Sequence, residues 1–261
     1  MHKNLDFSDL LRLIDDRSTA FRAALAAAPS LDAPVPTCPG WTLFDLAQHL
    51  GDGRHAWAAT VAAGPTATAK AAPESPAAPR ERAALLEWYT DSSRQLVDAL
   101  RQAGPDRGCW TWWEDSQSPN TCGAVARHQL QQVAVHTYDA QAAFGTPLPL
   151  PEEVALDGVD EFLHTCCATT SAWPHEPAVV EYHATEGRSW HLSLSAEGAR
   201  VTPLTAPATA ANTASDRAYA SARGTAGELV LALYGRIPMG SLEVEGDPRI
   251  FDQLQEWDPS A

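Results

Sequence analysis

The fold is decided by residues 35–50, VPTCPGWTLFDLAQHL. A proline-rich connection, residues 28–39, leads into Gly40-Trp41-Thr42, where Thr42 can cap a helix whose first turn holds Asp45. Apolar residues then recur, so this helix should run to about Ala62. The stretch therefore predicts one long helix that carries a histidine, His49, near its start.

Three further segments have the same helical character. Residues 5–26 and 81–102 place apolar side chains at spacings of three and four, which is one face of an amphipathic helix. Residues 121–144 form another long segment, which ends at Gly145 with Pro147 beyond it, the expected stop signal. Four helices joined in this way predict a helical bundle.

The pattern changes after Pro174. Residues 178–184 and 189–195 alternate and are separated by Glu186-Gly187-Arg188, which is typical of a β-hairpin. Residues 200–205 and 241–245 are expected to be further strands and residues 227–234 an intervening helix, while residues 152–165 precede the change as one more helix. The predicted fold class is therefore α plus α+β, with a bundle over residues 1–170 and a small α+β domain over residues 175–261.

Charge and composition narrow the class of protein. The formal charge of −15 repels a phosphate backbone, so nucleic acid is not expected as a partner. No stretch of about 18 uncharged apolar residues is present, and residues 1–16 mix charges into their apolar positions, so we expect no membrane partner and a cytoplasmic location.

The cysteines do not indicate a disulfide or zinc-binding framework. They are odd in number and lack a CxxC pair, so neither a disulfide scaffold nor a zinc knuckle is expected. Cys38 could be a reactive thiol, but such a cysteine is more often a small, partly buried apolar residue, and we do not assign it as the nucleophile. The five positions are Cys38, Cys109, Cys122, Cys166 and Cys167.

Two histidines occupy different predicted helices of the bundle. His49 lies in the second helix and His136 in the fourth, where Gln132 precedes it by four residues and shares its face. These three side chains could converge on one ion and leave a position open for water or a thiolate. The alternative is that each histidine is simply hydrogen-bonded or exposed, and spacing alone does not decide between the two.

Three motifs carry a resemblance to a known family. Residues 35–50 are similar to the opening motif of the mycothiol-dependent maleylpyruvate isomerase family, and residues 132–145 with 157–162 resemble its Glu-x-x-x-His-x-x-Asp-Ala segment and the helix after it. Residues 224–236 with 242–248 resemble its C-terminal domain. The resemblance covers nearly the whole chain and implies a DinB-like, metal-binding four-helix bundle, with His49, Gln132 and His136 as metal ligands.

One position departs from the family pattern, because the metal-binding glutamate is Gln132 in this chain. A neutral amide oxygen is a weaker ligand for a divalent cation than a carboxylate is.

Asp45 and Asp139 lie near the expected ligands and could orient the imidazoles from a second shell, or could be exposed helix charges. Arg236 could clamp a carboxylate of the substrate or thiol cofactor as a catalytic residue, or could form a salt bridge or a helix C-cap.

The resemblance implies an enzyme with a divalent metal, for which zinc is expected, and with mycothiol as thiol cosubstrate. Bound zinc would lower the pKa of a coordinated thiol so that the thiolate exists at neutral pH. We therefore expect an isomerase or S-transferase that acts on a small electrophilic metabolite. The alternative is a non-catalytic small-molecule-binding or regulatory protein on the same fold, with a weakened or lost metal site.

Overall fold

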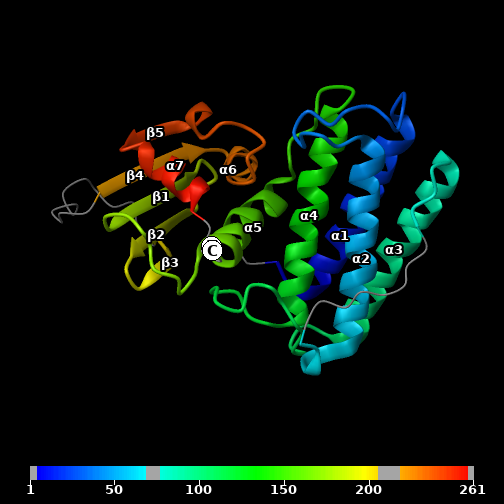
Figure 1. Ribbon diagram of the computed structural model, residues 1–261, viewed down its shortest axis with the longest axis horizontal. Helices are drawn as coiled ribbons and strands as arrows, with labels where there is room; N and C mark the ends of the chain where they lie inside the picture. The colour runs from blue at the N-terminus through cyan, green and yellow to red at the C-terminus, as the bar shows by residue number, and fades with distance from the viewer. Residues whose placement is uncertain (1–4, 69–76, 205–217, 258–261) are drawn as a thin grey trace. The chain divides into compact units, whose positions relative to one another are not determined.

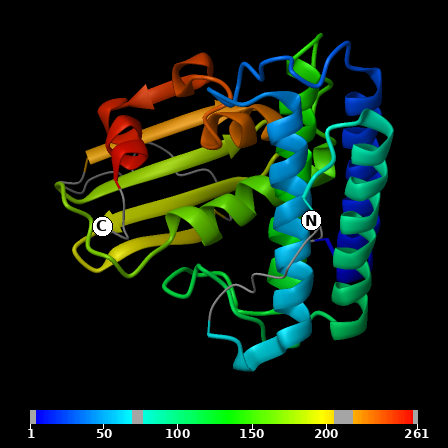
Figure 2. The same ribbon diagram turned by 45° about the vertical axis from the view of Figure 1, so that its right-hand side comes forward.

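The computed structural model describes residues 5–68, 77–204 and 218–257 (Figures 1 and 2). It divides into two compact units, the first within Met1–Trp112 and Pro119–Leu150 and the second within Trp113–Ser118 and Pro151–Ala261. The sequence placed the boundary near residue 170. The division comes earlier because helix α5 (Glu152–Phe162) packs against α6 (Ala226–Leu233) and so belongs to the second unit.

The first unit is a bundle of four long helices, counted over its described residues. They are α1 (Phe7–Ala27), α2 (Leu43–Ala63), α3 (Arg82–Ala103) and α4 (Cys122–Ala142), and a short 3₁₀ turn, η1 (Gly64–Thr66), follows α2. α1 packs against α4 and α3, and α2 packs against α3 and α4. The seam between α2 and α4 therefore lies on the opposite side of the bundle from the seam between α1 and α3.

Local sequence explains where these helices begin. Thr42 and Asp45 form a reciprocal capping box at the start of α2, and the side chain of Thr121 accepts from Ala124 N at the start of α4. The apolar faces of the helices meet in a core that contains fully buried side chains such as Phe21 and Leu46. The predicted bundle is thus stabilised by the apolar faces of its helices and by the helix caps, both of which are visible in the sequence.

The second unit is built on a five-stranded sheet. Its strands are β1 (Ala178–Ala184), β2 (Ser189–Ser195), β3 (Gly198–Pro203), β4 (Ala218–Gly224) and β5 (Glu243–Gly246), in the order β3-β2-β1-β4-β5. β1 and β4 are parallel and the other neighbours are antiparallel. The predicted hairpin is β1 and β2, paired with Tyr182 opposite Trp190.

One face of this sheet forms the core of the second unit. Val180 and Tyr182 of β1 and Trp190 and Leu192 of β2 are buried, as the alternation of a strand requires. Phe251 of α7 (Arg249–Glu256) contacts Tyr182, with ring centroids 6.1 Å apart. α5 continues into a single π-helical turn, η2 (Leu163–Cys167), and a 3₁₀ turn, η4 (Met239–Ser241), precedes β5.

The fold class expected from the sequence, α plus α+β with a bundle before the sheet, is confirmed. Two elements were not expected, β4 and α7. The strand expected over residues 200–205 is β3, which ends at Pro203, and residue 205 lies outside the described residues. Within the described ranges, every helix is too short or too polar to cross a membrane.

Candidate functional site

The motif that opens α2 folds into a tight loop. Val35 N donates to Trp41 O at 2.9 Å and Leu43 N donates to Ala33 O at 3.0 Å, so the two arms of the loop are paired. Gly40 has φ +84°, a left-handed conformation that favours glycine. The loop therefore holds the residues between its arms in fixed positions at the start of α2.

His49 and His136 lie together, as the sequence suggested. His49 comes from α2 and is exposed, whereas His136 comes from α4 and is 7% exposed. Their ring centroids are 5.3 Å apart with an interplanar angle of 84°. Trp41 of the loop lies beside His49, with ring centroids 4.8 Å apart. Two helices and one loop thus bring these three rings into one place.

Asp139 is the centre of the hydrogen bonding around His136. Its carboxylate is fully buried and lies 2.8 Å from His136 Nδ1. It also accepts from Thr37 Oγ1 at 2.6 Å and from Cys38 Sγ at 3.4 Å. Because an ionised carboxylate only accepts, Nδ1 of His136 carries the proton, and Nε2 remains as the nitrogen that can accept from or ligate another group.

The two imidazoles fit one shared metal ion. An imidazole nitrogen lies about 1 Å from the ring centre and about 2 Å from zinc, so two imidazoles on a tetrahedral ion have centres about 5 Å apart. The observed 5.3 Å between His49 and His136 matches this separation. A second-shell carboxylate on the other nitrogen of a ligating histidine is the usual arrangement, and Asp139 supplies it to His136.

The remaining expected ligand, Gln132, lies on α4 one turn before His136 and is half-buried. Within the described part of the chain, one group of cysteine, histidine and carboxylate side chains has its ligand atoms within 4.8 Å of one another, and it consists of Cys38, His136 and Asp139. This group shares His136 with the expected set. It places a thiol and a carboxylate beside that histidine, neither of which the sequence assigned as a ligand.

Asp45 has a clear structural task. Its Oδ2 accepts from Thr42 N at 2.9 Å and from Thr42 Oγ1 at 2.6 Å, and these hydrogen bonds lower the pKa of the Asp45 carboxyl. The same residue lines a hollow of about 420 Å³ together with Trp41, Gln48 and His49. A small molecule in this hollow would lie against the exposed histidine.

Arg236 belongs to the second unit. Its Nη1 donates to Tyr234 O at 2.7 Å, just after α6 ends at Leu233. This bond corresponds to the C-cap alternative considered from the sequence, because it satisfies a carbonyl at the end of a helix.

Thr37 and Cys38 are the site residues that sequence reasoning missed. Cys38 is half-buried, as expected, but its thiol donates to Asp139 instead of packing only against apolar neighbours. The partners are 102 and 101 residues apart in the chain, so no local spacing could reveal them. The only signal in the sequence was that Thr37 and Cys38 lie in the motif over residues 35–50, in the turn that precedes α2.

Family models and solved structures match almost the whole chain. The model described as the mycothiol maleylpyruvate isomerase N-terminal domain matches residues 11–141, and the model described as the MDMPI C-terminal domain matches residues 153–253. No curated protein matches the sequence significantly. The boundary between the two matches falls where the structure separates its two units.

Two solved structures have a similar fold. One is the crystal structure of a histidine-to-alanine mutant of the mycothiol-dependent maleylpyruvate isomerase, with a TM-score of 0.62 and 14% identity over 94% of this chain and 96% of that chain. The other is a crystal structure of the mycothiol-dependent maleylpyruvate isomerase, with a TM-score of 0.58 and 14% identity over 90% and 93%. At this identity the similarity concerns the fold.

Proposed function

Because the chain belongs to the mycothiol maleylpyruvate isomerase family, we propose that it is a cytoplasmic, metal-dependent enzyme that uses mycothiol. Its reaction is the isomerisation of a small electrophilic metabolite or the transfer of a thiol to it. The metal is a divalent cation, for which imidazole ligands favour zinc, and its ligands are His49, Gln132 and His136. The observation that carries this proposal is the 5.3 Å separation of the two imidazoles, with Asp139 behind one of them.

Each residue of the site has a task in this proposal. Asp139 holds the proton on Nδ1 of His136, so that Nε2 would be the nitrogen that ligates the metal. When bound, zinc would lower the pKa of a coordinated thiol, which makes the thiolate available at neutral pH. Trp41 and Asp45 line the hollow beside His49 through which thiol and electrophile would approach. Asp45 is proposed to act on that side as an outer carboxylate that orients His49.

Arg236 is proposed to hold a carboxylate of the electrophile or of the thiol. A guanidinium can bind a carboxylate through two parallel N–H bonds. The bond from Nη1 to Tyr234 O holds the guanidinium at the end of α6. Arg236→Lys should raise the KM for a carboxylated substrate while the zinc content stays unchanged, and an unchanged KM would remove this role.

Metal content and turnover in the presence of mycothiol test the core of the proposal. Protein purified without chelator should contain about one equivalent of zinc, as expected for one ion held by three protein ligands with its fourth position open. With mycothiol and an electrophile such as maleylpyruvate it should turn over, seen as isomerised substrate with the thiol returned or, for a thiol transfer, as consumption of mycothiol, and His49→Ala should lose both the metal and the turnover. Less than about a tenth of an equivalent of any transition metal, with no uptake on addition, would contradict a metal site.

Gln132→Glu provides a second and independent test. If Gln132 is a ligand, an anionic oxygen replaces a neutral one on the metal, and zinc affinity should rise at least about 10-fold. If the bundle binds no metal, the new half-buried carboxylate has no cation beside it and should destabilise the fold by a few kcal/mol or take up a proton. Gln141→Glu, also half-buried on α4, is the matched control, since it adds the same charge outside the site. Unchanged zinc affinity with a lower melting temperature in Gln132→Glu would rule out Gln132 as a ligand.

The neutral side chain of Gln132 also favours one other function. A site that binds metal weakly could serve a binding or regulatory protein that performs no reaction. The two functions differ in turnover, so a panel of electrophiles with mycothiol, tested with and without added zinc, separates them. Binding of an electrophile with neither isomerisation nor thiol consumption under either condition would favour the non-catalytic protein.

A further inference from the structure

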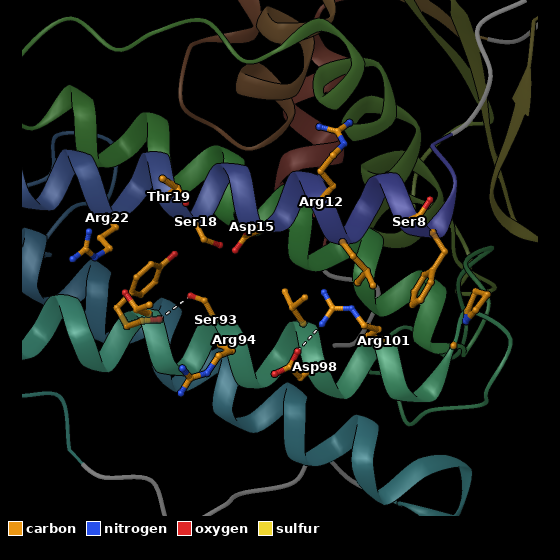
Figure 3. Close-up of a pocket in the computed structure, with 17 residues that line it drawn as sticks. Ser8, Arg12, Asp15, Ser18, Thr19, Arg22, Ser93, Arg94, Asp98 and Arg101 are labelled. Carbon is orange, nitrogen blue, oxygen red and sulfur yellow. Dashed lines mark hydrogen bonds and ion pairs between the residues drawn. The ribbon is translucent and has the colours of Figure 1, made fainter.

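The hollow between α1 and α3 is larger than the one beside His49, with a volume of about 840 Å³ (Figure 3). Charged side chains line it, but three of its arginines form ion pairs with aspartates of their own helices. These pairs are Arg12 with Asp9 and Asp16, Arg94 with Asp91, and Arg101 with Asp98. Among the described residues that line this hollow there is neither a histidine nor a cysteine. The thiol that the proposed function leaves unused lies elsewhere, in the loop before α2.

The backbone of this loop holds Cys38 in place. Its N–H donates to Val35 O and its carbonyl accepts from Trp41 N, both at 3.0 Å. The side chain is half-buried, at the start of the segment that leads into α2. The sulfur is therefore fixed relative to the helix and remains partly accessible to a small ion.

Three ligand atoms converge beside this sulfur. Cys38 Sγ lies 3.4 Å from Asp139 Oδ2, and His136 Nδ1 lies 2.8 Å from the same residue's Oδ2. One ligand atom from each of the three residues lies within 4.8 Å of the other two. Two ligand atoms on a tetrahedral ion of the size of zinc are about 3.3–3.8 Å apart. The sulfur–oxygen separation already fits such an ion, and the nitrogen–oxygen separation would open by about 0.5 Å.

Protons occupy the place that such an ion would take. The thiol and Nδ1 of His136 both donate to Oδ2 of Asp139. When an ion binds, the thiol loses its proton to solvent, and the imidazole loses the proton on Nδ1 and gains one on Nε2, so that one proton is released for each ion. Thr37 Oγ1 donates to the other carboxylate oxygen at 2.6 Å and would keep the carboxylate oriented.

The charges of these ligands favour a divalent cation. A thiolate and a carboxylate together carry two negative charges, which neutralise the ion beside the fully buried Asp139. The set of His49, Gln132 and His136 is neutral and leaves the charge of the ion uncompensated. A sulfur ligand also selects thiophilic ions, among them zinc and the softer cadmium.

We propose that Cys38, His136 and Asp139 form a second metal site, which takes a thiophilic divalent cation. Its ion binds Nδ1 of His136, whereas the zinc of the proposed function binds Nε2. A neutral imidazole carries one proton, so only one of its nitrogens is available to an ion at a time. An ion at Cys38 therefore competes with the zinc site for His136. The competition rests on the proposed function, but the Cys38 site itself does not.

Cadmium is the probe, and ultraviolet titration of the chelator-dialysed full chain in a thiol-free buffer is the assay. About one equivalent should bind and give thiolate-to-cadmium charge-transfer absorption. Cys38→Ser should abolish this absorption and weaken cadmium binding at least about 10-fold, since loss of a direct ligand costs no less than loss of an outer one. Serine can still donate to Asp139, so this variant should fold. Cys109→Ser is the matched control, because it removes a buried thiol of the same unit and should change neither quantity.

The same titrations can overturn the proposal. No cadmium binding to the parent, absorption that persists in Cys38→Ser, or absorption that is lost in Cys109→Ser would each do so. If Cys38→Ser does not fold, the cadmium NMR resonance of the parent decides, because its position reports the number of sulfur ligands. One sulfur supports the Cys38 site. No sulfur overturns it, as do two, which would place the ion between Cys109 and Cys122, whose thiols are hydrogen-bonded to each other.

His49→Ala separates this site from the zinc site of the proposed function. The variant should keep the cadmium affinity of the parent, because His49 is not a ligand of the Cys38 site. Cadmium binding that depends on His49 and not on Cys38 would overturn this inference and leave the proposed function standing. Cadmium binding that depends on Cys38, in a chain that takes up no zinc through His49, would support the second site and remove the proposed function. Cadmium and zinc bound together in one chain would refute the competition for His136.

Discussion

Replacing Asp139 with asparagine tests the arrangement around His136 most directly. The side chain keeps its shape, and one oxygen can still accept from Thr37, at 2.6 Å in the parent. At the other position an amide NH₂ replaces the oxygen that accepts from Cys38 at 3.4 Å and faces His136 Nδ1 at 2.8 Å. The amide donates where the carboxylate accepted, so His136 must move its proton to Nε2 to avoid two donors in contact.

Two consequences of Asp139→Asn follow from this change of tautomer. The hydrogen bonds of a buried carboxylate contribute about 1.5–3 kcal/mol each, so the loss of one to two of them should lower the free energy of unfolding by about 1.5–6 kcal/mol. The proton on Nε2 now occupies the nitrogen that would bind metal. Because loss of such an outer carboxylate usually weakens metal binding, zinc affinity should fall about 10- to 100-fold.

Urea unfolding in the presence of chelator measures the first quantity, and zinc competition against a chromophoric chelator measures the second. Thr37→Val is the matched control. It removes one hydrogen bond from the same carboxylate but leaves the bond to His136, so it should lower stability by about 1–3 kcal/mol without changing zinc affinity. Zinc affinity within about 2-fold of the parent in Asp139→Asn would refute the role of Asp139, as would an equal loss of affinity in Thr37→Val.

Two further predictions concern the fold. Gly198 and Gly187 both have positive φ, but a Cβ at Gly198 would clash with Thr169 O, whereas nothing lies within 4 Å of a Cβ at Gly187. Gly187→Ala should therefore lower the free energy of unfolding in urea by about 1–2 kcal/mol and Gly198→Ala by clearly more. Equal losses in the two variants would contradict the clash. Thr42→Ala should cost about 1 kcal/mol through loss of the cap of α2. The pKa of Asp45 is lowered in the folded state, so the stability that its bonds with Thr42 contribute is present above the unfolded pKa of about 3.9 and is lost as the pH falls through the folded value. A parent and a Thr42→Ala variant that differ by the same amount at pH 7 and at pH 2.5 would contradict this account.

The helices and the hairpin could be predicted from the sequence because their signals are local. The expected helix to about Ala62 is α2, and the hairpin over residues 178–184 and 189–195 is β1 and β2 with the same bounds. β4 was missed because its sequence, AYASARG, is small and polar and alternates weakly. It becomes a strand through its parallel pairing with β1, which a local pattern cannot indicate.

Only part of the candidate site could be predicted from such local patterns. Helical spacing put Gln132 and His136 on one face, and the bundle prediction allowed His49 of the second helix to converge with them. The family resemblance then favoured these three residues as metal ligands. Spacing could not indicate that the histidines would lie with their ring centroids 5.3 Å apart, because that distance depends on how α2 and α4 pack.

By itself, then, the sequence determined most of the secondary elements, the order of the two domains and the residue types available for a metal. The tertiary structure alone decided which of these residues meet. It brings Thr37 and Cys38 onto Asp139 across about a hundred residues of chain, and it buries Arg54 against Ser93. The physical reason is that hydrogen bonds and periodicity within a helix depend on neighbours a few residues away, whereas a buried charge takes its partners from whichever elements the packed core places beside it.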